Sequence, residues 1–111
     1  MREMAWTSLC ELAELCEDVG RYVEIGGFQL AVFLHGGEVF VLDNRCPHAG
    51  ANLAGGYIEG GCVVCPKHSW PFRLRDGQLR DTPGVNVDTY EVRLLERQGM
   101  SPLVQVDLPM Y

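Results

Sequence analysis

Paired glycines divide this chain into short segments, and their spacing limits what it can fold into. Gly-Gly stands at positions 26–27, 36–37, 55–56 and 60–61, and Asp76-Gly77 adds a further turn signal. Glycine readily adopts the positive φ angles that tight hairpin turns require. The runs between the pairs are rich in Val, Ile, Phe and Tyr, which are typical of strands. The spacing therefore predicts an all-β fold built from antiparallel hairpins.

We expect strands in the following runs: residues 22–25, 28–34, 38–42, 57–59, 62–65, 72–75, 89–95 and 103–108. The last two alternate apolar and polar residues, which predicts a hairpin that turns around residues 96–101. The start of the chain is ambiguous, because 8–18 fits a short amphipathic helix and 7–12 fits an edge strand. We favour the strand. The 111 residues contain no linker or repeat, so we expect one domain over 1–111.

Composition excludes several classes of protein. The chain is 47% hydrophobic and 22% charged, as globular proteins are, and its formal net charge is −6. This charge disfavours nucleic acid as a partner and suits brief docking against a basic patch. The longest apolar run, residues 30–34, is far shorter than the ~20 residues of a membrane-spanning helix. Acidic residues interrupt the N-terminus where a signal peptide would be apolar, so we expect a cytoplasmic protein whose five cysteines are thiols or metal ligands.

Two segments interrupt the β pattern, and each combines a cysteine with a histidine. Cys46-Pro-His48 follows the expected strand 38–42, and Cys65-Pro-Lys-His68 ends the expected strand 62–65. Each segment offers one thiolate and one imidazole, and 16 residues separate the first histidine from the second cysteine. Proline fixes the backbone beside each cysteine. We therefore expect two rigid loops.

This C-x-H…C-x-x-H pattern resembles that of the Rieske family of iron–sulfur proteins. The resemblance implies stacked antiparallel sheets with two cluster-binding hairpin loops. It also implies one [2Fe–2S] cluster, with Cys46 and Cys65 on one iron and His48 and His68 on the other. Two neutral imidazoles in place of thiolates remove negative charge, which raises the reduction potential to between about −150 and +300 mV.

Other interpretations of these residues compete with the cluster. Structural zinc often has two Cys and two His ligands, but zinc fingers usually group like ligands, whereas each loop here mixes them. An unoccupied relic of a cluster site is a further alternative. Cys62-Val-Val-Cys65 matches a thiol redox motif, yet its valines predict a strand that directs the two cysteines to opposite faces. We expect Cys10, Cys16 and Cys62 to pack as small apolar side chains.

Departures from the membrane-bound respiratory Rieske proteins favour the ferredoxin-like branch of the family. Those members carry an extra cysteine in each loop, joined as a disulfide, at positions where this chain has Ala51 and Lys67. They also carry Ser and Tyr hydroxyls that raise the potential, where this chain has Trp70 and Phe72. We expect these two aromatic residues to shield the cluster and anchor the second loop. The resemblance then implies a low potential, between about −150 and 0 mV.

The residues that remain favour an electron carrier over an enzyme. A Rieske oxygenase adds an iron held by two histidines and a carboxylate, and only His35 is left once four ligands are assigned. No G-x-G-x-x-G nucleotide fingerprint is present. We therefore expect a one-electron carrier between a flavin reductase and a terminal oxygenase. The alternatives are a small subunit bound to the large subunit of an NAD(P)H-dependent assimilatory nitrite reductase, and a redox or iron sensor.

Overall fold

The structure is a computed structural model that describes residues 6–47 and 50–108. Within these ranges, the strands are β1 (Trp6–Glu11), β2 (Arg21–Ile25), β3 (Phe28–His35), β4 (Glu38–Asp43), β5 (Tyr57–Glu59), β6 (Cys62–Val64), β7 (Pro71–Arg73), β8 (Thr89–Tyr90), β9 (Val92–Arg97) and β10 (Met100–Asp107). The helical turns are η1 (Leu12–Glu14) and η2 (Leu53–Gly55). The all-β prediction is confirmed. None of the helices described is long and apolar enough to cross a membrane.

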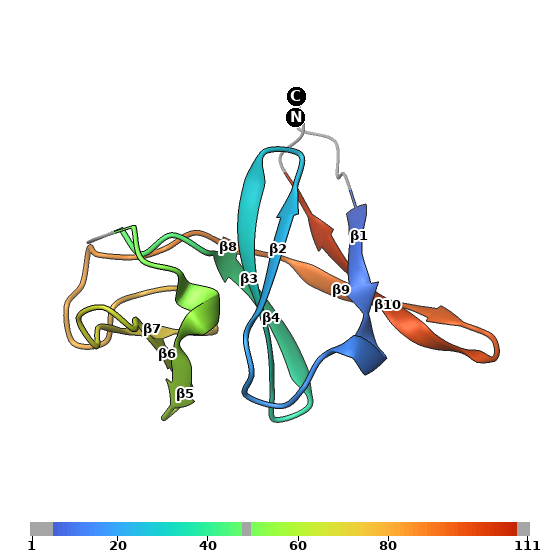
Figure 1. Cartoon of the computed structure of the whole chain (residues 1–111), viewed down its shortest axis with the longest axis horizontal. Coiled ribbons are helices and arrows are strands. Elements are labelled where there is room, and N and C mark those ends of the chain that lie inside the picture. Colours follow the sequence, from blue (N-terminus) through green and yellow to red (C-terminus); the bar gives the residue numbers. More distant parts are fainter. Residues whose placement is uncertain (1–5, 48–49, 109–111) are drawn as a thin grey trace.

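The strands form three antiparallel sheets, ordered β1-β10-β9, β2-β3-β4-β8 and β5-β6-β7 in the described part of the chain. Figure 1 shows the β5-β6-β7 sheet at one end of the molecule and the β9–β10 hairpin projecting at the other. The glycine pairs at 26–27, 36–37 and 60–61 all have positive φ and close hairpins, as expected. The pair at 55–56 does not, because Gly56 has φ −80° and lies where a Cβ would stand 2.2 Å from the Val64 carbonyl oxygen.

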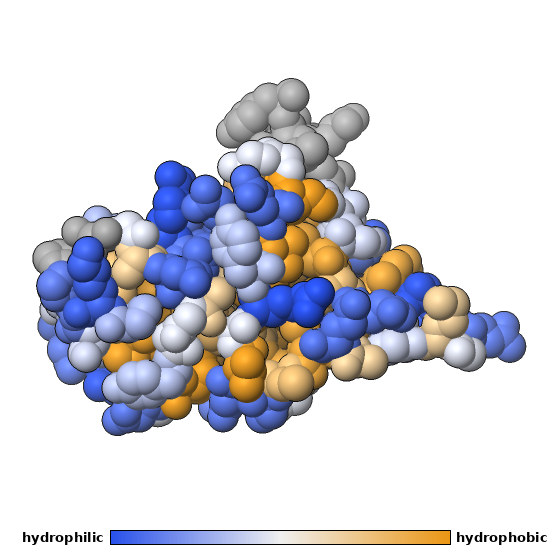
Figure 2. Space-filling view, viewed as in Figure 1, coloured by the Kyte–Doolittle hydropathy of each residue, from blue (hydrophilic) through white to orange (hydrophobic). Residues whose placement is uncertain are grey.

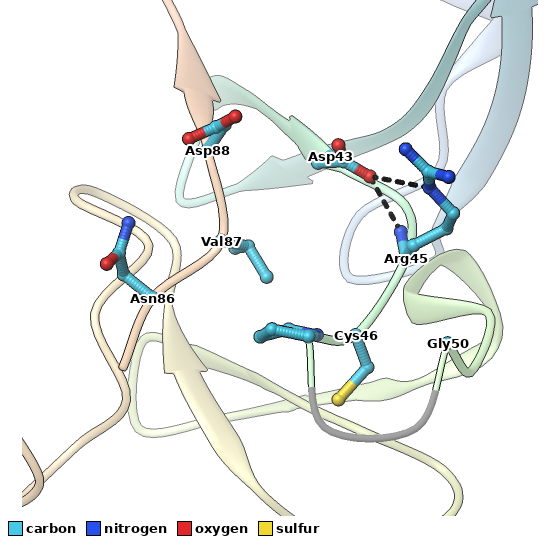
Figure 3. A pocket seen from close by; sticks show the side chains of 8 residues that line it. Asp43, Arg45, Cys46, Gly50, Asn86, Val87 and Asp88 are labelled. Atoms are coloured by element: carbon cyan, nitrogen blue, oxygen red, sulfur yellow. Dashed lines mark hydrogen bonds and ion pairs between the residues drawn. The ribbon is translucent and has the colours of Figure 1, made fainter. Parts of the chain in front are cut away.

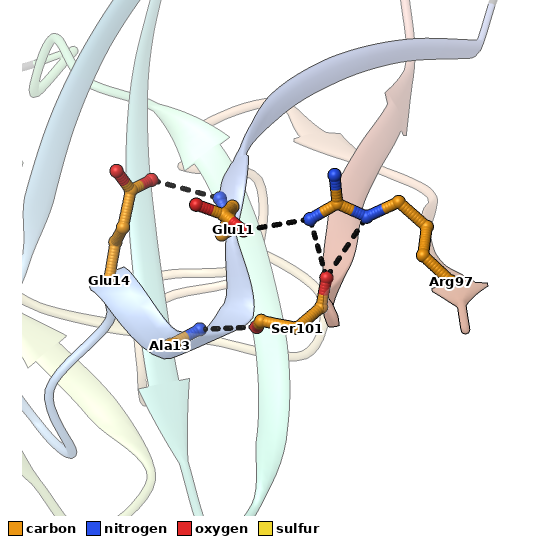
Figure 4. Close-up of polar contacts among 5 residues, drawn as sticks. All are labelled: Glu11, Ala13, Glu14, Arg97 and Ser101. Atoms are coloured by element: carbon orange, nitrogen blue, oxygen red, sulfur yellow. Dashed lines mark hydrogen bonds and ion pairs between the residues drawn. The ribbon is translucent and has the colours of Figure 1, made fainter. Parts of the chain in front are cut away.

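The ambiguous N-terminal segment is a strand, as favoured, followed by the short turn η1. The Glu14 carboxylate accepts the Glu11 N–H in this turn at 2.9 Å, and the Ala13 N–H donates to Ser101 Oγ at 3.0 Å (Figure 4). Arg97 takes part in the same group of contacts, since its Nη2 donates to Glu11 Oε1 at 2.8 Å. These contacts tie β1 to the β9–β10 hairpin.

The strand expected over 89–95 is interrupted at Glu91. Tyr90 pairs with Val41 in the central sheet, whereas Val92 pairs with Val106 in the other sheet. The chain therefore changes sheets at Glu91, whose carbonyl accepts the Asp107 N–H at 3.0 Å. The hairpin expected around residues 96–101 is confirmed, with its turn between β9 and β10.

Strand β3 separates two hydrophobic cores. Leu30 and Val32 on one face and Ala31 and Phe33 on the other are all fully buried. The loop-side core consists of Ala31, Phe33, Leu42, Cys46, Leu53, Val63, Cys65, Phe72, Leu74, Leu79 and Val87. The hairpin-side core consists of Cys10, Leu15, Leu30, Val32, Val39, Val41, Val104, Val106 and Leu108. Each fully buried Val, Leu or Phe contributes about 1.5–3 kcal/mol, so both sheets that flank β3 are held to it by apolar packing.

Candidate metal centre

The first cysteine loop follows β4 directly. The Cys46 N–H donates to the Ala51 carbonyl at 3.0 Å, and the Gly50 N–H donates to the Cys46 carbonyl at 2.7 Å. Gly50 has φ +66°, a left-handed conformation that favours glycine. Cys46 is buried in the loop-side core. His48 lies outside the described residues, so its predicted place as a ligand stays a prediction.

The second cysteine loop, between β6 and β7, repeats this hydrogen-bond pattern. The Cys65 N–H donates to the Trp70 carbonyl at 2.8 Å, and the Ser69 N–H donates to the Cys65 carbonyl at 2.9 Å. Ser69 takes the place of glycine and also has a left-handed φ, +58°. The sequence gives no sign of this conformation, because serine rarely adopts it. The two loops therefore share one backbone design despite their different cysteine–histidine spacing.

The second loop separates its two candidate ligands between core and solvent. Cys65, like Cys46, is 1% exposed and belongs to the loop-side core, whereas His68 is exposed. Trp70 packs against the same core, and its ring centroid lies 6.5 Å from that of the buried Phe72. This arrangement bears out the expectation that the two aromatic residues anchor the second loop.

The other three cysteines lie away from these positions. All five are free thiols. Cys62 is buried but does not belong to the loop-side core, to which Val63 and Cys65 contribute. This difference is expected of a strand, in which successive side chains point to opposite faces. Cys10 lies in the hairpin-side core, where burial raises the pKa of its thiol. The prediction that Cys16 packs as an apolar residue is wrong, because the turn after η1 leaves it exposed.

Asn44 anchors the first loop, a role that its place in the sequence does not predict. Its side chain is buried, and its Oδ1 accepts the Ala54 N–H at 2.8 Å. Its backbone N–H donates to the Gln29 carbonyl, and its carbonyl accepts the Leu53 N–H, both at 2.8 Å. The available signal was the Asp-Asn dipeptide immediately after a strand, since these residues favour turns with side-chain hydrogen bonds. Asn44 thereby joins β3, η2 and the start of the loop.

A surface pocket of about 400 Å³ lies beside the first loop. Asp43, Asp88 and Cys46 are among its lining residues, and Figure 3 shows the Cys46 sulfur pointing away from both carboxylates. Asp43 Oδ1 accepts the Arg45 N–H at 2.9 Å. Burial, with smaller contributions from Asp43 and Asp88, raises the pKa of Tyr90 to about 12. The phenol of Tyr90, which packs against the hairpin-side core, therefore stays neutral at physiological pH.

The described cysteines supply donors of the kind that a two-iron cluster needs. Among the residues that the structure describes, only Glu17, Asp18 and His35 bring three potential ligand atoms within 4.8 Å of one another. This group lies apart from the loop-side core that holds Cys46 and Cys65. Two buried thiols from matching loops also supply the soft donors that cluster iron prefers.

An all-β frame with two matching cysteine loops defines a class of protein that holds an iron–sulfur cluster at loop tips. The model of the Rieske [2Fe-2S] domain matches residues 5–91 of this chain, and the chain therefore belongs to the Rieske family. Its cofactor is one [2Fe–2S] cluster.

Known relatives include both small ferredoxins and larger enzymes. The chain is 34% identical to the anthranilate 1,2-dioxygenase ferredoxin subunit of Burkholderia cepacia, over 84% of this chain and 87% of that protein. It is 36% identical to cholesterol 7-desaturase of Hemicentrotus pulcherrimus over 70% of this chain, but it spans only 17% of that protein. The chain spans 13% of the cholesterol 7-desaturase of Xenopus laevis.

Two solved structures show the same fold along nearly their whole length. The Sphingomonas yanoikuyae B1 ferredoxin has a TM-score of 0.80 and 32% identity, covering 95% of this chain and 100% of that one. A candidate NADH-dependent nitrite reductase small subunit from Mycobacterium tuberculosis has a TM-score of 0.82 and 27% identity, covering 97% and 99%. The prediction of a Rieske-type fold is confirmed.

Replacing Ser69 by glycine should stabilise the protein. Glycine adopts the left-handed φ of +58° without the steric cost that serine bears, so we expect a gain of about 0.5–1 kcal/mol in the free energy of unfolding. Gly50→Ala is the matched control, because its φ is +66° and a Cβ there meets no atom within 4 Å. It should cost about 1 kcal/mol. Thermal unfolding of the two variants should therefore shift in opposite directions, and a loss of stability in Ser69→Gly would contradict this account.

Proposed function

We propose that the cluster is held by Cys46, His48, Cys65 and His68, with the two thiolates on one iron and the two imidazoles on the other. The matching loops, the burial of both thiols in one core and the exposure of His68 support this assignment. The cluster, when bound, accepts and releases one electron. The buried cysteines keep its inner side away from water, and the exposed His68 lies where electrons can pass to a docked protein.

The function best supported is that of a cytoplasmic one-electron carrier between a flavin reductase and a terminal oxygenase. The observation that carries it is the match to ferredoxin components along 87% and 86% of their own length, in the anthranilate and naphthalene dioxygenase systems. Most of the length of such a ferredoxin therefore has a counterpart in this chain. The net charge of −6 suits brief docking to a basic patch on each partner.

A second candidate is the small subunit of an NAD(P)H-dependent nitrite reductase. The 99% coverage of the Mycobacterium tuberculosis structure favours it as a specific alternative. The two candidates differ in how long the partner stays bound, since a subunit remains with its enzyme and a carrier dissociates after each electron.

Affinity purification from native cells, followed by a reconstituted electron-transfer assay, separates these functions. A carrier should purify without a stoichiometric partner and should transfer electrons from a flavin reductase to an oxygenase in catalytic amounts. A stoichiometric large reductase subunit would overturn the carrier in favour of the second candidate. Failure to reduce any oxygenase, with no large subunit present, would contradict both.

The midpoint potential should lie in the lower part of the Rieske range, between about −150 and 0 mV at neutral pH. Neither Trp70 nor Phe72 carries a hydroxyl that could stabilise the reduced cluster. Phe72→Tyr adds one such donor inside the loop-side core. It should raise the midpoint potential by roughly tens of millivolts, since 59 mV corresponds to a tenfold change in the equilibrium constant of a one-electron couple.

Protein-film voltammetry measures both values. Phe28→Tyr is the matched control, because Phe28 packs against the hairpin-side core and its variant should leave the midpoint unchanged. A wild-type midpoint of about +300 mV, at the upper end of the range, would contradict the low-potential assignment.

A further inference from the structure

Asn44 is a buried polar side chain at the end of the molecule that holds the cysteine loops. Hydrophilic side chains cover much of this end on the face that Figure 2 shows, whereas Asn44 is only 5% exposed. The buried polar side chains of the described residues are Asn44, Gln105 and Asp107, and the last two lie on β10. Burial of a polar side chain costs free energy unless it is hydrogen-bonded. The partners of Asn44 therefore indicate its role beside the first loop.

Asn44 closes the base of the loop that carries Cys46. Its carbonyl accepts the Leu53 N–H and its Oδ1 accepts the Ala54 N–H, both at 2.8 Å, so two successive N–H groups of η2 bind one residue. Two residues beyond Asn44, the Cys46 N–H donates to the Ala51 carbonyl at 3.0 Å. The two limbs of the loop are therefore joined at Asn44 and again at Cys46, and a shift of Asn44 against η2 moves the cysteine with it.

The far end of η2 lies against the start of the second cysteine loop. Gly56 follows η2, and its N–H donates to the Leu53 carbonyl at 2.9 Å. A Cβ at Gly56 would stand 2.2 Å from the Val64 carbonyl oxygen, so the two backbones are in direct contact. Val64 immediately precedes Cys65. One short turn thus connects the base of the first loop to the start of the second.

Neighbouring segments leave η2 little room to move. A Cβ at Gly20 would stand 2.2 Å from the Ala54 carbonyl oxygen, so backbone also packs against η2 from the segment before β2. Leu53 is fully buried in the loop-side core, which also contains Cys46 and Cys65. Because interiors are close-packed, a displacement at one side of η2 is passed on to the other and not absorbed.

We propose that Asn44 is a positioning residue for the iron–sulfur cluster, because by holding η2 it sets the position of Cys46 relative to Cys65. A cluster bound by two loops needs its thiolates at one fixed separation, and the residues that support ligands maintain such geometry. The proposal rests on the ligand set proposed above. It adds to that set a residue that acts through η2 and is not itself a ligand.

Challenge of the cluster-loaded full chain with the Fe²⁺ chelator bathophenanthroline tests this role. Asn44→Leu fills a similar volume but leaves the Ala54 N–H without its acceptor. Its visible absorption should therefore disappear about tenfold faster than that of the wild type. The EPR spectrum of its reduced cluster should also broaden, because the separation of the two cysteines then varies among molecules.

Two further variants of Asn44 separate the hydrogen bond from the side-chain volume. Asn44→Ser removes the same contact without adding an apolar group, because its hydroxyl is one bond closer to the backbone, and it should also lose the cluster faster. It keeps the test decisive where Asn44→Leu does not fold. Asn44→Asp retains an oxygen that accepts the Ala54 N–H and should lose its cluster at close to the wild-type rate.

Gln105→Leu is the matched control. Gln105 is likewise a buried carboxamide, 8% exposed, whose Oε1 accepts the Arg93 Nε–H at 2.8 Å and whose Nε2 donates to Ser8 Oγ at 3.0 Å. These contacts lie within the β1-β10-β9 sheet, away from the cysteine loops. Gln105→Leu should therefore lower the melting temperature but leave the rate of cluster loss unchanged.

Two outcomes overturn the proposal. One is cluster loss in Asn44→Leu and Asn44→Ser that is no faster than in Gln105→Leu, and the other is an Asn44→Asp variant as fast as Asn44→Leu. An error in the ligand set would appear elsewhere, as loss of the cluster on substitution of Cys10, Cys16 or Cys62. The two failures are therefore distinguishable.

Discussion

Cys46→Ser and Cys65→Ser should each yield a protein that lacks the visible absorption and the iron of the wild type. A hydroxyl is a poor substitute for a soft thiolate at cluster iron. Both cysteines are buried in the loop-side core. Among the described residues that core contains no other cysteine, so no neighbouring thiol can take their place. Absorption spectroscopy, iron and acid-labile sulfide assays, and EPR of the reduced protein measure the loss. Wild type should contain about two irons and two sulfides per chain.

The controls are the other cysteines. Cys62→Ala is the strictest, because Cys62 stands three residues from Cys65 and is equally buried but is not part of the loop-side core. Cys10→Ser and Cys16→Ser should likewise keep the full spectrum. Loss of colour in one of these three, or a colourless wild type with one zinc per chain, would show that the ligand assignment is wrong.

Gly77→Ala should destabilise the protein by about 2–4 kcal/mol. A Cβ at Gly77 would stand 2.2 Å from the Val87 carbonyl oxygen, and backbone cannot move aside as a flexible side chain can. The same contact region holds the hydrogen bond from the Val87 N–H to the Gly77 carbonyl at 2.9 Å. Overpacking costs about 1–3 kcal/mol, and a left-handed φ adds about 1 kcal/mol. The melting temperature should fall by roughly 10 °C or more.

Gly61→Ala isolates the steric part of this effect. Its φ is +77°, close to the +73° of Gly77, but a Cβ there meets no atom within 4 Å. It should cost only about 1 kcal/mol. Equal melting temperatures for the two variants would mean that the close approach of Val87 does not limit this turn.

Local signals in the sequence were sufficient for most hairpins and for both cysteine loops. A glycine pair between β-branched runs predicts a turn wherever the chain simply reverses, as at 36–37 and 60–61. The prediction of a hairpin turn is wrong at 55–56. There Gly56 is needed because a Cβ would collide with the Val64 carbonyl oxygen, and its φ is one that other residues also adopt. A close approach between distant segments leaves no local pattern that distinguishes it from a turn.

Features that depend on tertiary contacts escaped prediction. The break at Glu91 follows from competition between two sheets, and the run 89–95 alternates too evenly to reveal it. The left-handed Ser69 is imposed by the hydrogen bonds of its loop against the propensity of its residue type. Asn44 acts through partners on β3 and η2 that the chain brings together only on folding.

The position of β3 between the two cores bears on how the protein opens in solution. Its backbone is hydrogen-bonded to β2 on one edge and to β4 on the other. The four residues at 30–33 are fully buried, with one core on each face of the strand. Amide protons there can exchange with solvent only when both cores separate together, so their exchange should report global unfolding. The cysteine loops and the β9–β10 hairpin thus belong to one cooperative unit, and a mutation that loosens either end should speed exchange in the strand they share.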